Sequence, residues 1–326
     1  MRPELLRADN WTPRTRTPWG GFKIVRHYKS SLGLEHAQEV VGESWEVSVE
    51  PSFPSVLART SMPLAKAIAD DPVGWLGAAV VSRHGPQLPL LVKLLDAADD
   101  LSVQVHPEAN DPELAADESG KPEAWIILEA EPGAGIYLGF RDGVDRQTVE
   151  ACLRSGGQLD TLMNFVPVAS GDVFVIDAGT VHAIGAGVTL VEPQHVVPGR
   201  RGVTYRYWDW NRRYNAHGGP DPNGSARPLH VERSLAVTRW DGPRGAAFVE
   251  QCRSKPRPLE SEGSMERVWL LAGATFTSER WQGSGELTTD TDGRFTAVTC
   301  VAGQAQLSAG GASVEIRCGQ SAVIPA

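Results

Sequence analysis

The chain of 326 residues lacks the features that mark several large classes of protein. Its cysteines number only four, stand far apart and form no CxxC pair, which excludes a disulfide scaffold and predicts reduced thiols; they are Cys152, Cys252, Cys300 and Cys318. No apolar run approaches the roughly 18 residues that a membrane span needs, and the first residues contain no hydrophobic signal region. The sequence therefore predicts a cytoplasmic protein that does not contact a membrane.

Basic residues are also in short supply, because 31 Lys and Arg face 40 Asp and Glu, for a net charge of −9. A pI near 5.4 argues against a nucleic-acid binder, which needs a broad basic face, so any anionic partner must be bound locally. The chain contains no G-x-G-x-x-G sequence, no P-loop and no alternation of strands and helices. These absences remove the common nucleotide-binding folds.

Short β-rich runs separated by Gly, Pro, Asp and Asn dominate what is present. They cover residues 44–49, 90–95, 101–105, 124–128, 135–138, 173–176, 188–191, 203–207, 295–301, 304–308, 313–317 and 321–324. Only residues 63–85 show apolar positions at helical spacing, with a break at Pro72. The pattern predicts a mainly β protein, an all-β sandwich or barrel with a small helical insertion.

The length suggests roughly two domains, and polar, turn-rich sequence between Trp240 and Pro258 suggests where they meet. We expect one domain over residues 1–240 and a second over 241–326. Residues 199–201 and 215–228 are expected to be surface loops.

Three short segments carry side chains that could hold a metal ion. In the predicted strand after Leu101, Gln104 and His106 project from the same face because the strand period is two. Glu123 opens the next apolar strand, and Lys121 precedes it by two residues. An isolated His in a strand is more often structural than functional, so these residues need a further partner to indicate a site.

The further partner is His182, at the end of a segment that begins at Gly171. The segment resembles the second motif of the cupin superfamily, G-(x)5-P-x-G-x-x-H, with Asp177 where proline usually stands. Two imidazoles, a carboxylate and an amide oxygen form a coherent set of ligands for zinc and leave room for water or substrate. Because no Cys is near, the set favours an open, catalytic type of site.

With these segments joined, the chain resembles the mannose-6-phosphate isomerase family in its short bacterial, zinc-dependent form. The resemblance runs from about residue 19 to the C-terminus and depends on an ordered set of motifs. They are WGG (19–21), GESWEVS (42–48), PLLVKLLDA (89–97), QVHP (104–107), KPE (121–123), AGTVHA (178–183), EPQ (192–194), TYRYWDWNR (204–212) and RPLH (227–230).

The resemblance implies a bicupin fold and one zinc ion per chain, with reversible interconversion of mannose 6-phosphate and fructose 6-phosphate through an enediolate. It makes the metal ligands His106, Glu123 and His182, with Gln104 as a fourth. It makes Arg206 the active-site arginine and matches Lys121 to a lysine associated with proton transfer. We rank Lys121 first as the base; Glu192 or a metal-bound hydroxide would also be able to serve.

Two departures from the family pattern affect the expected site. Residues 195–203 form an insertion near the substrate loop, and its Arg200 and Arg201 would be able to contact a phosphate, although exposed arginines are more often only solvated. The C-terminal residues from Gly319 to Pro325 begin the cupin motif again, and the sequence stops before a ligand position. We therefore expect residues 241–326 to be a degenerate cupin-like unit without metal.

Two other classes of function remain open on the sequence. One is a cupin metalloenzyme of another kind, either an iron oxygenase or an isomerase of a different sugar phosphate. The other is a sugar-binding bicupin without catalysis. The KPE and TYR motifs favour a sugar phosphate as substrate. The oligomeric state is expected to be a monomer or a homodimer.

Overall fold

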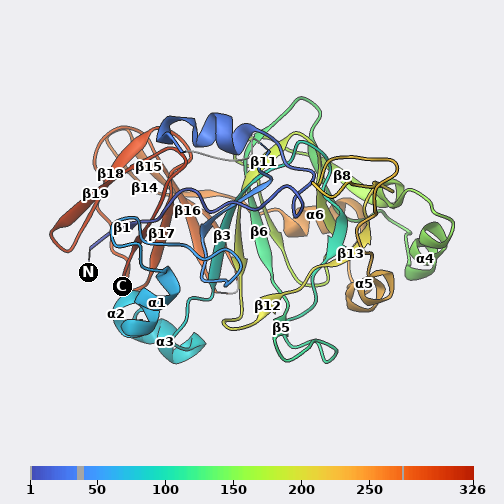
Figure 1. Ribbon diagram of the computed structural model, residues 1–326, viewed down its shortest axis with the longest axis horizontal. Helices are drawn as coiled ribbons and strands as arrows, with labels where there is room; N and C mark the ends of the chain where they lie inside the picture. Colours follow the sequence, from blue (N-terminus) through green and yellow to red (C-terminus); the bar gives the residue numbers. More distant parts are fainter. Residues whose placement is uncertain (1, 35–39, 274) are drawn as a thin grey trace.

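Two five-stranded antiparallel sheets form the larger part of the molecule in the computed structural model, which describes residues 2–34, 40–273 and 275–326 (Figure 1). The first sheet has the order β2 (Glu43–Val47), β3 (Leu90–Asp96), β11 (Val188–His195), β6 (Glu123–Ala130) and β9 (Val173–Ile176). The second has the order β13 (Tyr205–Trp208), β4 (Val103–Val105), β10 (His182–Ile184), β7 (Gly135–Phe140) and β8 (Met163–Pro167).

The space between these sheets is filled by alternate side chains from their strands. Trp125 and Ile127 of β6 and Leu190 of β11 form one buried cluster with Ile136 and Leu138 of β7. Alternate side chains of each strand point at the partner sheet, and together they form this apolar core. The mainly β class is confirmed.

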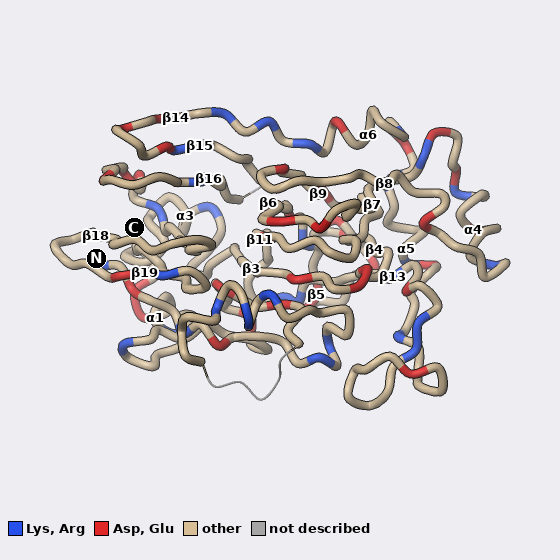
Figure 2. Tube along the Cα trace, turned by 90° about the horizontal axis from the view of Figure 1, so that it is seen from above, with Lys and Arg blue, Asp and Glu red and all other residues tan. Residues whose placement is uncertain are grey.

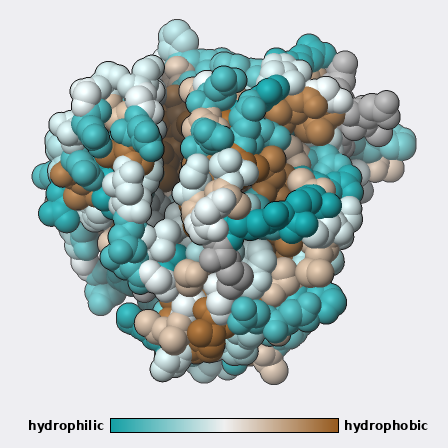
Figure 3. Space-filling model, turned by 90° about the vertical axis from the view of Figure 1, so that its left-hand side faces the viewer, coloured by the Kyte–Doolittle hydropathy of each residue, from teal (hydrophilic) through white to brown (hydrophobic). Residues whose placement is uncertain are grey.

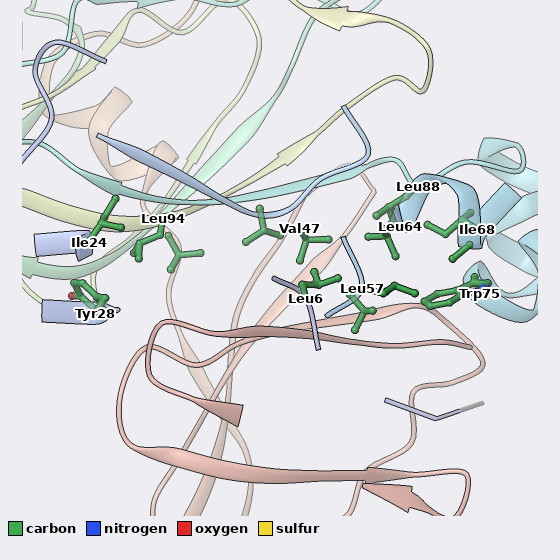
Figure 4. Close-up of a cluster of buried hydrophobic side chains, with 14 of the residues drawn as sticks. Leu6, Ile24, Tyr28, Val47, Leu57, Leu64, Ile68, Trp75, Leu88 and Leu94 are labelled. Atoms are coloured by element: carbon green, nitrogen blue, oxygen red, sulfur yellow. The ribbon is translucent and has the colours of Figure 1, made fainter. Parts of the chain in front are cut away.

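The predicted helical insertion is present as three short helices, α1 (Leu64–Asp70), α2 (Pro72–Leu76) and α3 (Ala78–His84). Pro72 is the first residue of α2, where its missing N–H costs no hydrogen bond, and this explains the break in the pattern. Leu64 and Ile68 of α1 and Trp75 of α2 pack with Val47 of β2 and Leu94 of β3 in a second buried cluster (Figure 4). The insertion therefore braces the outer face of the first sheet.

The prediction that residues 63–85 are the one helical region was wrong. The structure also contains α4 (Arg146–Arg154), α5 (Val231–Val237) and α6 (Gly245–Cys252), together with the single turns η1 (Ile24–Tyr28), η2 (Ser30–Leu32) and η3 (Leu159–Leu162). A signal for α4 was present, because Asp145 caps it by accepting a hydrogen bond from the Thr148 N–H at 2.8 Å. Helix α6 lies in the stretch that turn-forming residues had marked as a linker.

Three of the four smaller sheets lie at one end of the molecule. They are β14 (Arg257–Glu262), β15 (Met265–Ala272) and β16 (Thr277–Gln282); β18 (Gln304–Ala309) and β19 (Ala312–Arg317); and β1 (Glu4–Leu5), β20 (Ser321–Ile324) and β17 (Thr296–Thr299). Strands β14 to β16 were not predicted. The space-filling view of this end shows mostly hydrophilic atoms, with a narrow furrow between two groups of side chains (Figure 3). The proposed boundary at residue 240 stays a prediction.

Acidic and basic residues are interspersed along the whole chain rather than gathered on one basic face (Figure 2). A further parallel pair, β5 (Glu118–Ser119) with β12 (Arg201–Gly202), joins two loops near the end of the main sheets. The predicted loop at residues 215–228 contains no helix or strand element.

Candidate active site

The register of the two main sheets brings the predicted site residues together from distant parts of the chain. Gln104 of β4 is paired with Arg206 of β13 on one side and with His182 of β10 on the other, so the three form a row across the second sheet. In the first sheet Glu123 of β6 is paired with Gln194 of β11. Because residues paired across adjacent strands point to the same face, each row presents its polar side chains together.

His106, Glu123 and His182 form a compact, fully buried group. His106 Nε2 lies 3.3 Å from Glu123 Oε2, and His182 Nε2 lies 3.4 Å from Glu123 Oε1. One ligand atom from each side chain lies within 4.8 Å of the others, and the three residues are 2%, 2% and 0% exposed. Within the described part of the chain, this is the one such group of three His, Cys, Asp or Glu residues.

The hydrogen bonds of the two histidines fix which ring nitrogen is free. His106 Nδ1 lies 3.0 Å from the Val203 carbonyl, and His182 Nδ1 lies 2.9 Å from the Thr180 carbonyl. Carbonyls only accept, so each Nδ1 carries the proton and each Nε2 presents a lone pair. His106 Nε2 and Glu123 Oε1 are buried with no hydrogen-bond partner. Unsatisfied acceptors converging on one point are the arrangement that a divalent cation satisfies.

The protonation states of these groups suit metal binding. Burial, assisted by the Lys121 charge, lowers the pKa of His106 to about 3, and burial also lowers the pKa of His182. Burial by itself would raise the pKa of Glu123, but the surrounding histidines and Lys121 hold it well below its usual value. Neutral imidazoles and an ionised carboxylate are the forms in which these side chains bind metals.

Gln104 lies beside this group and connects it to Arg206. Its Nε2 is 3.3 Å from His182 Nε2, and its Oε1 accepts a hydrogen bond from Ser102 Oγ at 3.4 Å. Arg206 Nε in turn donates to Ser102 Oγ at 3.1 Å. Because amide oxygen and nitrogen have nearly the same shape, Gln104 would present its oxygen to a metal after a half-turn of the amide. Burial and the Arg227 charge lower the pKa of Arg206 to about 10, so the guanidinium stays charged at neutral pH.

A wall of buried charges continues from Glu123 along the first sheet. Lys121 Nζ lies 3.6 Å from Glu123 Oε2, and burial lowers the pKa of this lysine. Lys93 Nζ lies 3.3 Å from Glu192 Oε1 and 3.9 Å from Glu43 Oε2. Burial and the negative charge of Glu123 raise the pKa of Glu192 to about 7. In this row, burial therefore lowers the pKa of Lys121 and raises that of Glu192, so each pKa shifts toward neutral pH.

The structure brings together Gln104, His106, Lys121, Glu123, His182 and Arg206, and it adds residues for which no role was predicted. Gln194 donates from Nε2 to Glu123 Oε2 at 2.6 Å, which orients the carboxylate. Lys93 is a second such residue. It stands inside an apolar strand, where no pattern of neighbouring residues marks it as part of a site. Arg201 is exposed and forms an ion pair with Glu118, and Arg200 is also exposed, so neither is placed by contacts at this group.

The chain is similar to known proteins of one family. The family model of the type I phosphomannose isomerase catalytic domain matches residues 15–135. The mannose-6-phosphate isomerase of Streptococcus mutans is 30% identical over 94% of this chain and 88% of its own length. The chain belongs to the mannose-6-phosphate isomerase family. A second member, mannose-6-phosphate isomerase ManA of Bacillus subtilis, is 29% identical over 70% of this chain and 66% of its own.

Solved structures of the mannose-6-phosphate isomerase family share the fold. The enzyme of Bacillus subtilis superposes with a TM-score of 0.81 at 23% identity, covering 100% of this chain and 94% of that one. A mannose 6-phosphate isomerase solved with zinc bound gives a TM-score of 0.61 at 18% identity, covering 99% and 94%. The described residues contain no helix of the length and apolarity that crossing a membrane requires.

Proposed function

We propose that this protein is a zinc-dependent aldose–ketose isomerase that interconverts mannose 6-phosphate and fructose 6-phosphate. The observation that carries the proposal is the convergence of buried, unpartnered acceptor atoms of His106 and Glu123 with His182, beside Arg206 and Lys121. Membership of the isomerase family supports the choice of reaction, and the zinc-bound relative supports the choice of metal.

His106, Glu123 and His182 would hold the ion, and Gln104 would supply a fourth ligand through its amide oxygen. Zinc bound there would polarise the sugar carbonyl and help to fix the two oxygens on C1 and C2. The imidazoles are held by the Val203 and Thr180 carbonyls, so their orientation is set before the metal binds.

The isomerisation moves a proton between C1 and C2 through an enediolate, so it needs a base near both carbons and positive charge near both oxygens. Arg206 supplies a fixed positive charge that is not lost at neutral pH. Lys121 is the base in this proposal, because burial lowers its pKa and so favours the uncharged amine; Glu192, whose pKa is about 7, is the alternative. Comparing Lys121→Met with Glu192→Gln separates the two, because only loss of the base itself removes proton exchange at C2.

A coupled assay for fructose 6-phosphate formed from mannose 6-phosphate tests the proposal. Turnover is expected from the holoenzyme, should disappear after chelation, and should return when Zn²⁺ is added. Absence of turnover with the metal fully loaded would overturn the function. We further propose a cytoplasmic location. We also propose that the protein is a monomer or a homodimer, and light scattering would distinguish these two oligomeric states.

A further inference from the structure

Arg206 lies on β13, the outermost strand of its sheet, so no strand of that sheet covers its outer edge. One residue, His230, fills the place of the missing strand. The His230 backbone N–H donates to the Arg206 carbonyl at 2.7 Å, and the ring Nδ1 of His230 accepts from the Arg206 backbone N–H at 3.1 Å. Both main-chain bonding groups of the arginine are therefore satisfied by the same histidine.

The segment that contains His230 also holds the guanidinium. Arg206 Nη1 donates to the Pro228 carbonyl at 3.0 Å, while Nε is held by Ser102 on the other side. His230 is itself fixed, because it precedes α5 and its carbonyl accepts from the Ser234 N–H at 2.8 Å. The RPLH motif at residues 227–230 thus holds both the backbone and the guanidinium of Arg206 in place.

The hydrogen bond from the Arg206 N–H to His230 Nδ1 can form in only one protonation state of His230. A backbone N–H can only donate, so Nδ1 must be bare and the ring proton must be on Nε2. If Nδ1 were protonated, its N–H would face the Arg206 N–H, and two donors cannot form a hydrogen bond. Burial and the positive charge of Arg206 lower the pKa of His230, which keeps the ring neutral. Tyr205 also lies near the ring, 6.1 Å away between centroids, and Arg227 of the same motif is paired with Asp209.

We propose that His230 is a positioning residue that holds Arg206 opposite Gln104 through the hydrogen bond to its Nδ1. Protonation of Nδ1 breaks this hydrogen bond and releases Arg206. The effect on turnover rests on the proposed isomerase function, whereas the hydrogen bond itself does not. A displaced guanidinium would no longer face the sugar oxygens, and small displacements of positioned groups have large effects on rate.

The matched pair His230→Asn and His230→Leu tests this role of the Nδ1 hydrogen bond. The two side chains share a branch at Cγ, and only Asn keeps an acceptor at the position of Nδ1. His230→Leu should lower kcat about 10- to 100-fold, whereas His230→Asn should stay within about threefold of wild type. Both should retain zinc, as should the exposed control His217→Asn. Combining His230→Leu with Arg206→Ala should cost nothing beyond Arg206→Ala alone, since the histidine acts through the arginine.

Titration gives a readout that a merely structural role would not move. Asn does not ionise, so the ratio of wild-type to His230→Asn kcat should fall as the pH drops through the pKa of His230. Equal rates for the Asn and Leu variants, or additive losses with Arg206→Ala, would overturn the proposal. If the wild-type protein shows no isomerase activity, ¹⁵N NMR of the ring still decides the point: a protonated Nδ1 at pH 8 would rule out the hydrogen bond.

Discussion

The carboxylate of Glu123 has the most crowded surroundings in the site, with two imidazoles, Lys121 and the amide of Gln194 all within 3.6 Å. Of these neighbours, Gln194 is the one that donates a short hydrogen bond and is not itself a proposed ligand or acid–base group. Its role is to hold Oε2 in a fixed orientation, and groups that orient metal ligands commonly affect affinity nearly as much as the ligands do.

Replacing Gln194 with Leu should therefore lower zinc affinity about 10- to 100-fold without unfolding the protein. Competition with a chromophoric chelator would measure the change. Gln282→Leu is a matched control, since Gln282 is exposed on β16 and its side chain donates to Glu266, away from the site. Equal zinc affinities for the two variants would contradict the role given to Gln194.

His182 and Arg206 should fail in different ways when truncated. His182→Ala removes a ligand and should abolish both zinc binding and activity. Arg206→Ala should leave bound zinc unchanged while kcat falls about 100-fold or more, as expected for a lost contact to developing negative charge. Metal analysis alongside kinetics checks both; loss of zinc from the Arg206 variant would show that the arginine supports the metal ligands instead.

Three of the proposed metal ligands could be predicted from local patterns in the sequence. Gln104 and His106 share a strand face, and His182 follows a turn glycine at fixed spacing. Lys93 and Gln194 could not be found in this way, since their partners Glu192 and Glu123 are chosen by the register of β3, β11 and β6. That register is set by contacts between strands far apart in the chain, which no short window of sequence contains.

At the scale of elements, strand β2 has a charged residue on each face. Glu43 points toward Lys93 in the site wall, while Glu46 points the other way and pairs with Lys29 of the N-terminal segment at 2.7 Å. Ser321 of β20 donates to Glu46 Oε2 at 2.9 Å, and Lys29 also donates to the Ala8 carbonyl at 2.8 Å. Glu46 thus ties the first main sheet to both ends of the chain.

Replacing Glu46 with Ala should lower the free energy of unfolding by about 3–5 kcal/mol, because Lys29 would remain as a buried charge without a counter-ion. Urea denaturation would measure the loss. The double variant Lys29→Met with Glu46→Leu removes both charges and should recover most of the stability. A double variant as unstable as the single one would show that packing, rather than the unpaired charge, causes the loss.

Asp209, just after β13, anchors the loop that follows. Burial alone would raise its pKa, but a hydrogen bond from Arg227 and the charges of Arg227 and Arg212 lower it overall. A carboxyl whose pKa is lower in the folded than in the unfolded state stabilises the fold above the unfolded value of about 3.9. This stabilisation is lost as the pH falls through the folded pKa.

The destabilisation caused by Asp209→Asn should therefore be large at pH 7 and shrink as the pH is lowered through the acid range. Urea midpoints of wild type and variant at pH 7 and pH 3 check this expectation. Asp290→Asn, at an exposed position outside the helices and strands, is the control and should change little at either pH. If the urea midpoints of wild type and the Asp209 variant differed by the same amount at both pH values, the stabilisation by Asp209 would not come from its charge.

The elements that the sequence missed have weak local patterns for physical reasons. Helix α5 has only seven residues, too few to show a convincing period. Strand β14 is exposed at all six positions and contains three charged residues, so it has no apolar alternation. Its identity as a strand comes from pairing with β15, a long-range contact again. The long apolar strands β3 and β6, by contrast, were apparent from composition alone.

At the scale of the whole molecule, the metal group joins the two main sheets, because His182 belongs to one and Glu123 to the other. Zinc binding should therefore stabilise the entire sandwich. At a thousandfold excess of zinc over its Kd, linkage predicts about 4 kcal/mol of added stability. Calorimetry of the chelated and zinc-loaded protein should show a higher Tm for the loaded form, and His182→Ala should show no such rise. An equal rise in that variant would place the metal elsewhere.

Strand β1 pairs with β20, with Glu4 opposite Val323 and Leu5 opposite Ala322. On the ribosome, β1 is made more than 300 residues before its partner β20. At bacterial or eukaryotic elongation rates of about 5–20 residues per second, the wait is about 15–60 seconds. During that interval Leu6, which is buried in the finished protein, has no Val323 to pack against. The sheet that β1 and β20 share can therefore form only once β20 has been made.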